Sequence, residues 1–87
     1  MCEKVRKGAY VMTFHAEDEM NADNFTVFDV ENGMLTGLIV ERQRDVDTGE
    51  SKYVIEGQSL GYRGIGIIAK LSPTDKLVII TVYDTEV

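Results

Sequence analysis

The chain has 87 residues, 44% of them hydrophobic, and a formal net charge of -6 at pH 7. The length fits one domain, residues 1–87, with one modest core, and the apolar content excludes a disordered chain. The apolar runs are too short to span a membrane, and the N-terminus lacks the apolar stretch of a signal peptide. A single cysteine cannot form an internal disulfide. We therefore expect a cytoplasmic protein with no membrane partner.

The first third of the chain is predicted to be mostly helical. Residues 3–8 can form a short helix, residues 10–14 a short strand or extended segment, and residues 15–22 a second helix. These assignments rest on the spacing of apolar residues and on the polar residues between them.

A third helix is marked by its own start signal. Thr26 and Asp29 have the spacing of a capping box, with Phe25 and Val30 at the two hydrophobic staple positions. Three residues recur at the helical period and should face the core: Val27, Val30 and Met34. Gly37 is predicted to end this helix in left-handed geometry.

After Gly37 the pattern becomes that of β-structure. Strands are predicted over 38–44, from 53 onward, over 65–70 and over 77–83, joined by short turns that favour an antiparallel meander. The fold class is therefore α+β, with two or three short N-terminal helices covering one face of a four-stranded antiparallel sheet. Alternation in the last strand predicts one face with Val78, Ile80 and Val82, and the other face with Ile79, Thr81 and Tyr83. Val30 and Ile80 are predicted to be core residues.

Charge is distributed unevenly along the chain. Residues 15–31 contain six acidic residues and no Lys or Arg. The helical side of the molecule should therefore be acidic and should repel phosphate backbones, so any nucleic acid would have to bind elsewhere.

His15 is the only histidine in the chain and the first candidate for proton chemistry, because histidine titrates near neutral pH. Cleavage of RNA needs an acid or base together with cations around the phosphate. His15 could be the acid or base, and the cations could be Arg42, Arg44 and Arg63. The candidate substrate-binding residues are Lys70, Tyr62 and Tyr83. The alternatives are that His15 packs at a helix start and that the arginines neutralise nearby carboxylates.

No cofactor or metal is predicted. His15, Asp18 and Glu19 share one helical face, but this spacing is common by chance and a metal site usually needs a further ligand from elsewhere. The glycines between Gly61 and Gly66 precede a strand rather than a helix, which favours a hairpin over a phosphate-binding loop.

Five segments together resemble domain-of-unknown-function family 4258, over about residues 4–84. They are Thr13–Ala16 with Met20, Thr26–Val30, Gly37–Glu41, Tyr53–Gly57 and Ile79–Tyr83. That family is related to BrnT toxins and more distantly to RelE/ParE toxins, so the resemblance implies a RelE/BrnT-like fold. It also implies a toxin-like component of a two-gene toxin–antitoxin-type module, acting as a weak or degenerate ribonuclease on RNA or the ribosome and pairing with a small antitoxin-like protein.

Two features depart from the toxin pattern. The chain has a pI of about 4.6, whereas such toxins are basic, and it lacks the arginine-rich C-terminal helix of BrnT. Two alternatives therefore stay open: a non-catalytic protein-interaction domain and a homodimeric protein of unknown function. A basic groove near His15 would favour the ribonuclease. An exposed apolar groove or sheet edge would favour the interaction domain, and a self-complementary apolar interface would favour the homodimer.

Overall fold

The computed structural model describes residues 2–86, which form three helices and five strands. The helices are α1 (Cys2–Arg6), α2 (Phe14–Ala22) and α3 (Val27–Thr36). The strands are β1 (Val11–Met12), β2 (Leu38–Arg44), β3 (Ser51–Gln58), β4 (Gly64–Leu71) and β5 (Leu77–Asp84). No helix in this part of the chain is long and apolar enough to cross a membrane.

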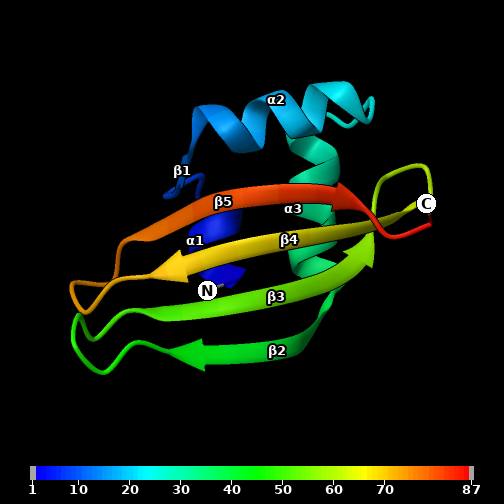
Figure 1. Ribbon diagram of the computed structural model, residues 1–87. Helices are drawn as coiled ribbons and strands as arrows, with labels where there is room; N and C mark the ends of the chain where they lie inside the picture. The colour runs from blue at the N-terminus through cyan, green and yellow to red at the C-terminus, as the bar shows by residue number, and fades with distance from the viewer. Residues whose placement is uncertain (1, 87) are drawn as a thin grey trace.

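The five strands form one mixed sheet in the order β1-β5-β4-β3-β2 (Figure 1). Strands β2 to β5 pair antiparallel with their neighbours along the chain, as the short turns predict. The prediction of a purely antiparallel four-stranded sheet is nevertheless wrong, because the extended segment before α2 joins the sheet as β1. Val11 and Met12 pair parallel with Val78 and Ile79 at the free edge of β5.

The helices lie on one face of the sheet, and the other face is open (Figure 1). Helix α2 packs on β5, helix α3 packs on β3 and β4, and α1 packs on α3. Thr13 caps α2 by accepting a hydrogen bond from the Ala16 N–H at 3.1 Å. The capping box predicted at Thr26 and Asp29 is confirmed in both of its hydrogen bonds.

Helix α3 and strand β3 approach so closely that only glycine fits between them. A Cβ on Gly57 would lie 2.3 Å from the Gly33 carbonyl oxygen, and a Cβ on Gly37 would lie 2.4 Å from the same atom. Gly37 has φ -79°, so the prediction of left-handed geometry is wrong: this glycine is required by close packing, not by its backbone angle.

The core lies between the helices and the sheet. Val30 and Met34 are buried there as predicted, whereas Val27 remains 36% exposed. The predicted alternation of β5 fails at a β-bulge: Ile79 pairs with Ala69 and Thr81 with Ile68, which leaves Ile80 as the extra residue. Ile79 and Val82 are therefore both buried, and Ile80 is only half-buried rather than a core residue.

Candidate functional site

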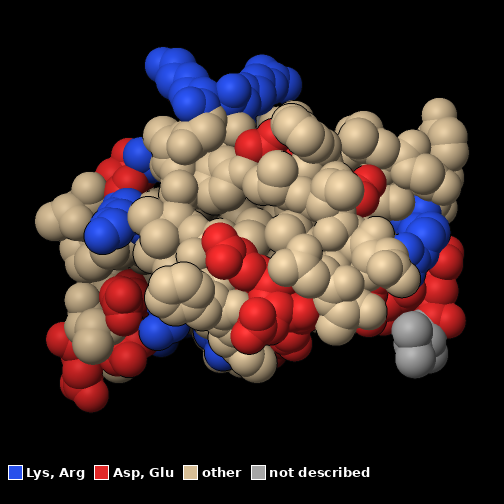
Figure 2. Space-filling model, turned by 90° about the horizontal axis from the view of Figure 1, so that it is seen from above, with Lys and Arg blue, Asp and Glu red and all other residues tan. Residues whose placement is uncertain are grey.

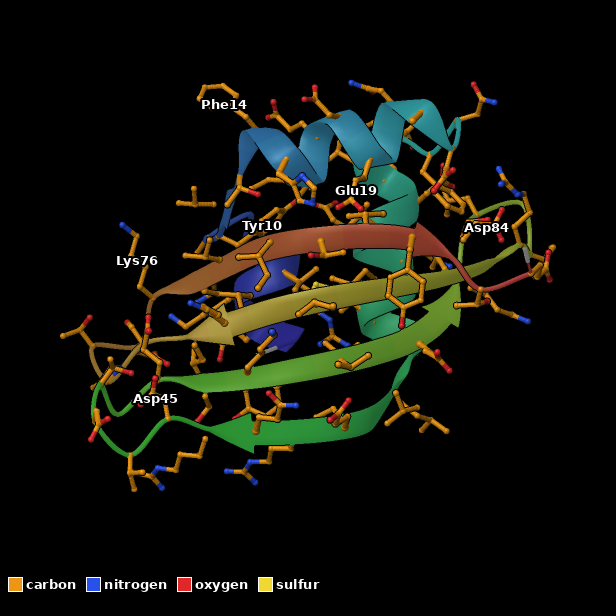
Figure 3. All side chains as sticks on the ribbon, viewed as in Figure 1. Tyr10, Phe14, Glu19, Asp45, Lys76 and Asp84 are labelled. Atoms are coloured by element: carbon orange, nitrogen blue, oxygen red, sulfur yellow. The ribbon has the colours of Figure 1, made fainter. Side chains whose placement is uncertain are left out.

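His15 lies in the first turn of α2, on the part of the molecule that covers β5. Its side chain is 71% exposed, and its Nε2 atom lies 3.1 Å from the Glu19 Oε1 atom one turn later. The same carboxylate oxygen accepts a hydrogen bond from the Val82 N–H at 3.4 Å. In Figure 3, Glu19 points from α2 toward β5, and Phe14 points away from the molecule. Glu19 thus links the helix to the last strand, and His15 contacts Glu19 from the same helix.

Arg63 is held in a structural role at the end of the sheet. It forms an ion pair with Asp84, donates a hydrogen bond from Nη1 to the Asp23 carbonyl at 3.1 Å, and stacks 4.4 Å from the centre of the Phe25 ring. A backbone hydrogen bond from Glu86 and the pairing with Arg63 lower the pKa of the Asp84 carboxyl. These contacts join the β3–β4 loop to β5 and to the segment between α2 and α3.

Arg42 and Arg44 lie on β2, at the opposite edge of the sheet from α2. β2 is three strands from β5, a separation of about 14 Å across the sheet. Arg42 stacks on the Tyr53 ring at 5.6 Å from its centre. The structure therefore brings Arg42 and Arg44 together, but it does not bring either of them to His15 or to Arg63.

The three predicted substrate-binding residues are also dispersed. Tyr62 is 80% exposed in the β3–β4 loop, with φ +63°. Tyr83 lies on the open face above Gly66, and its hydroxyl donates a hydrogen bond to Glu56 at 3.3 Å. Burial and the Glu56 charge raise the pKa of the Tyr83 hydroxyl. Lys70 lies near the other end of β4, 3.9 Å from a Glu50 carboxylate oxygen.

Strand β2 presents the most accessible backbone edge of the sheet. Every one of its seven residues is exposed, and its far side has no strand partner among residues 2–86. Its first half is apolar: Leu38 is 74% exposed, Ile39 52% and Val40 54%. Val40 is the extra residue of a bulge, because Ile39 pairs with Ile55 and Glu41 with Val54. Such an edge is a template for pairing with another extended chain.

A hollow lies where β2 and β3 meet their connecting hairpin, beside β4. It has a volume of about 480 Å³. The residues that line it are Gln43, Arg44, Asp45, Val46, Glu50, Lys52 and Lys70. Two predicted site residues, Arg44 and Lys70, thus share this hollow with Lys52, which the sequence did not single out. In Figure 3, Asp45 marks this end of the sheet, and Asp84 lies at the other end.

The side of the molecule formed by α2 carries acidic side chains at its centre (Figure 2). Figure 2 looks down on α2 and shows acidic side chains across the middle of that side, with Lys and Arg at its margins. This view shows no basic groove. Within residues 2–86, no group of three His, Cys, Asp or Glu side chains is arranged to hold a metal ion.

A family model described as "Domain of unknown function (DUF4258)" matches residues 12–84, which include α2, α3, the strands β2 to β5 and the second residue of β1. The chain therefore belongs to this family. No curated protein and no solved structure matches it.

Proposed function

We propose that this member of the DUF4258 family is a non-catalytic protein-interaction domain that binds an extended segment of a small partner protein along β2. The observation that carries the proposal is the edge itself, a seven-residue strand whose residues are all exposed and which has no neighbour on its outer side among the described residues. An added strand would satisfy the free N–H and C=O groups of β2, which is the source of affinity in strand-addition complexes.

The apolar residues of β2 support the same proposal. Leu38, Ile39 and Val40 form a continuous apolar stretch on the edge, yet each leaves half or more of its side chain exposed. Burial of such side chains contributes about 25 cal/mol per Å² of apolar area removed from water. The isolated chain does not gain this free energy, whereas binding of a partner strand that covers these side chains would provide it.

The competing proposal is a weak or degenerate ribonuclease. It requires an acid or base and cations around one phosphate. His15 is paired with Glu19 over β5, Arg63 is paired with Asp84, and Arg42 and Arg44 lie on the far edge. This geometry gives the ribonuclease no assembled site, whereas the interaction proposal needs no change of conformation. The small antitoxin-like partner implied by the resemblance fits the interaction proposal equally well.

The test of the proposed function uses an edge-blocked variant, Leu38→Lys/Val40→Lys, because lysines on an edge strand oppose strand addition. The matched control, Val11→Lys/Phe14→Lys, makes the same change at exposed apolar residues next to the other edge. Peptides from a random display library would be selected on the wild-type protein and then measured against both variants. We expect binding to the wild type and the control and loss of binding to the edge-blocked variant. Peptides that bind all three proteins alike would contradict the proposal.

The ribonuclease is tested separately, by expressing the wild type and His15→Ala in a bacterial host and following growth and messenger RNA integrity. We expect RNA to be equally intact in both cultures. Degradation of RNA by the wild type alone would establish the catalytic alternative.

A further inference from the structure

We infer that the segment bound along β2 is apolar at one end and acidic at the other, and that its acidic end lies in the hollow beside the β2–β3 hairpin. This inference rests on the proposed function and specifies the chemistry of the partner. It follows from the way side chains change along β2, from its start next to α3 to its end at the hairpin.

The start of β2 is apolar on both faces of the sheet. Leu38 pairs with Glu56 and Ile39 with Ile55, so these neighbours point to opposite faces. Ile55 is buried in the core, which places Ile39 on the helix side and Leu38 on the open side. A partner strand therefore meets an apolar side chain at this end whichever way its own residues point.

The hairpin end of the strand is cationic on both faces. Arg44 pairs with Ser51, whereas Lys52 pairs with Gln43 on one side and with Lys70 on the other. Like charges directly opposite each other in a sheet are destabilising, and here Lys52 and Lys70 face each other. A carboxylate between them would relieve that repulsion.

Two of the three cations that line the hollow have no ion-pair partner in the described chain. Lys4, Lys7, Arg63 and Lys70 have ion-pair partners. Within residues 2–86, Arg44 and Lys52 have no such partner, as is also true of Arg6, Arg42 and Lys76, although acidic residues outnumber basic ones by 15 to 9.

The two acidic residues of the hollow, Asp45 and Glu50, offset the charge of its three cations only in part. One oxygen of Asp45 accepts hydrogen bonds from the N–H groups of Asp47 and Thr48, at 2.9 and 3.3 Å, and so closes the hairpin loop. Glu50 lies 3.9 Å from Lys70 and is its ion-pair partner. Arg44 and Lys52 are left facing the hollow without a carboxylate of their own.

A second copy of the chain fits this edge poorly in the register that pairs all seven residues of β2. Antiparallel pairing of two β2 strands about a two-fold axis at Glu41 would set Glu41 against Glu41 and Leu38 against Arg44. A polynucleotide also fits poorly, because its phosphates repeat along the whole strand, whereas β2 is apolar at its start and carries Glu41 at its centre. A peptide can match both ends.

The experiment uses the peptides selected on the wild-type protein and compares Lys52→Gln/Lys70→Gln with the control Arg6→Gln/Lys7→Gln, which removes the same charge at the C-terminal end of α1 and the residue after it. Selected peptides should carry Asp or Glu toward one end and apolar residues toward the other. We expect their dissociation constants to rise roughly three- to tenfold for the hollow variant and to stay unchanged for the control. A peptide with Lys in place of its acidic residues should bind Lys52→Glu/Lys70→Glu better than it binds the wild type.

The outcomes separate the two proposals. Peptides without acidic residues that still require an unblocked β2 would overturn this inference and leave the proposed function standing. Acidic peptides that bind the edge-blocked variant undiminished would overturn the proposed function. A short oligouridylate that displaces the peptide at physiological salt would identify the hollow as a nucleic-acid site and overturn the inference. A selection that yields no binding peptide would overturn both.

Discussion

Strands β4 and β2 belong to the same sheet but use their apolar residues in opposite ways. On β4, Ile65, Ile67 and Ala69 are fully buried at 0% exposure, under α3 and between two neighbouring strands. On β2, all seven residues are exposed, and no helix or strand covers the outer edge among the described residues. The difference separates residues that stabilise this chain from residues left available to another chain.

The largest expected effect is at the centre of the sheet. Ile67→Ala should lower the free energy of unfolding by about 2–5 kcal/mol, because it leaves a cavity where the side chain is fully buried. Ile39→Ala, the same change on β2, should cost less than about 1 kcal/mol, since half of that side chain is already in water. Urea denaturation monitored by circular dichroism gives both values. Equal losses would show that β2 is not the exposed edge described here.

The second effect tests the contact between α3 and β3, the strand that separates β2 from the core. Gly57→Ala should destabilise the protein by about 1–3 kcal/mol, because its Cβ would lie 2.3 Å from a backbone oxygen that cannot move independently. Gly61→Ala is the control, because its Cβ would meet only the Ser59 hydroxyl at 3.9 Å. Equal melting temperatures for the two variants would contradict the close approach of α3 to β3 at Gly57.

The third effect depends on pH and concerns the end of the sheet opposite the hollow. The pKa of Asp84 is lowered in the folded state by a backbone N–H of Glu86 and by Arg63. A carboxyl whose folded pKa is depressed contributes stability that is present above its unfolded pKa, near 3.9, and that is lost as pH falls through the folded pKa. Asp84→Asn should therefore be less stable than the wild type at pH 7, and this difference should shrink below about pH 4. A difference that is constant with pH would assign the loss to packing rather than to charge.

The smallest effect on stability is expected at the edge itself. Leu38→Lys/Val40→Lys should change the free energy of unfolding by about 0.5 kcal/mol or less, because both side chains are more than half exposed. The same variant should lose peptide binding. Substitutions on β2 should therefore affect binding but not stability, whereas substitutions in the core of β4 should affect stability. A large loss of stability here would mean that the stretch from Leu38 to Val40 supports the fold.

Local signals were readable from the sequence, whereas those that depend on neighbours were not. The capping box of Thr26 and Asp29 spans four residues and needs no tertiary partner, so its pattern is sufficient. Strand β1 has two residues and carries no periodicity, so only its pairing with β5 defines it. The bulge at Ile80 is hidden in a strand that is apolar at nearly every position, where a shift of one residue leaves the composition unchanged.

The candidate surface was only partly predictable for the same reason. The sequence identifies Arg42, Arg44 and Lys70 as cations of the sheet, and the structure places Arg44 and Lys70 in one hollow. The sequence does not show which strand lies at the edge of the sheet, so the exposure of Leu38 to Val40 was not predicted. The polar second half of β2, compared with the apolar β4 and β5, is the signal that could have indicated an edge strand.

The pairing of β1 with β5 has a consequence for the order in which the protein can fold. Val11 pairs with Val78, 67 positions later in the chain, and α2 also packs on β5. Contacts so distant in sequence slow folding, because the intervening loop must close before they form. During synthesis, α2 and β1 therefore have no strand to pack against until β5 has been made. Helix α3 can pack on β3 and β4 before that point, whereas α2 can reach its place in the fold only after residues 77–84 have been translated.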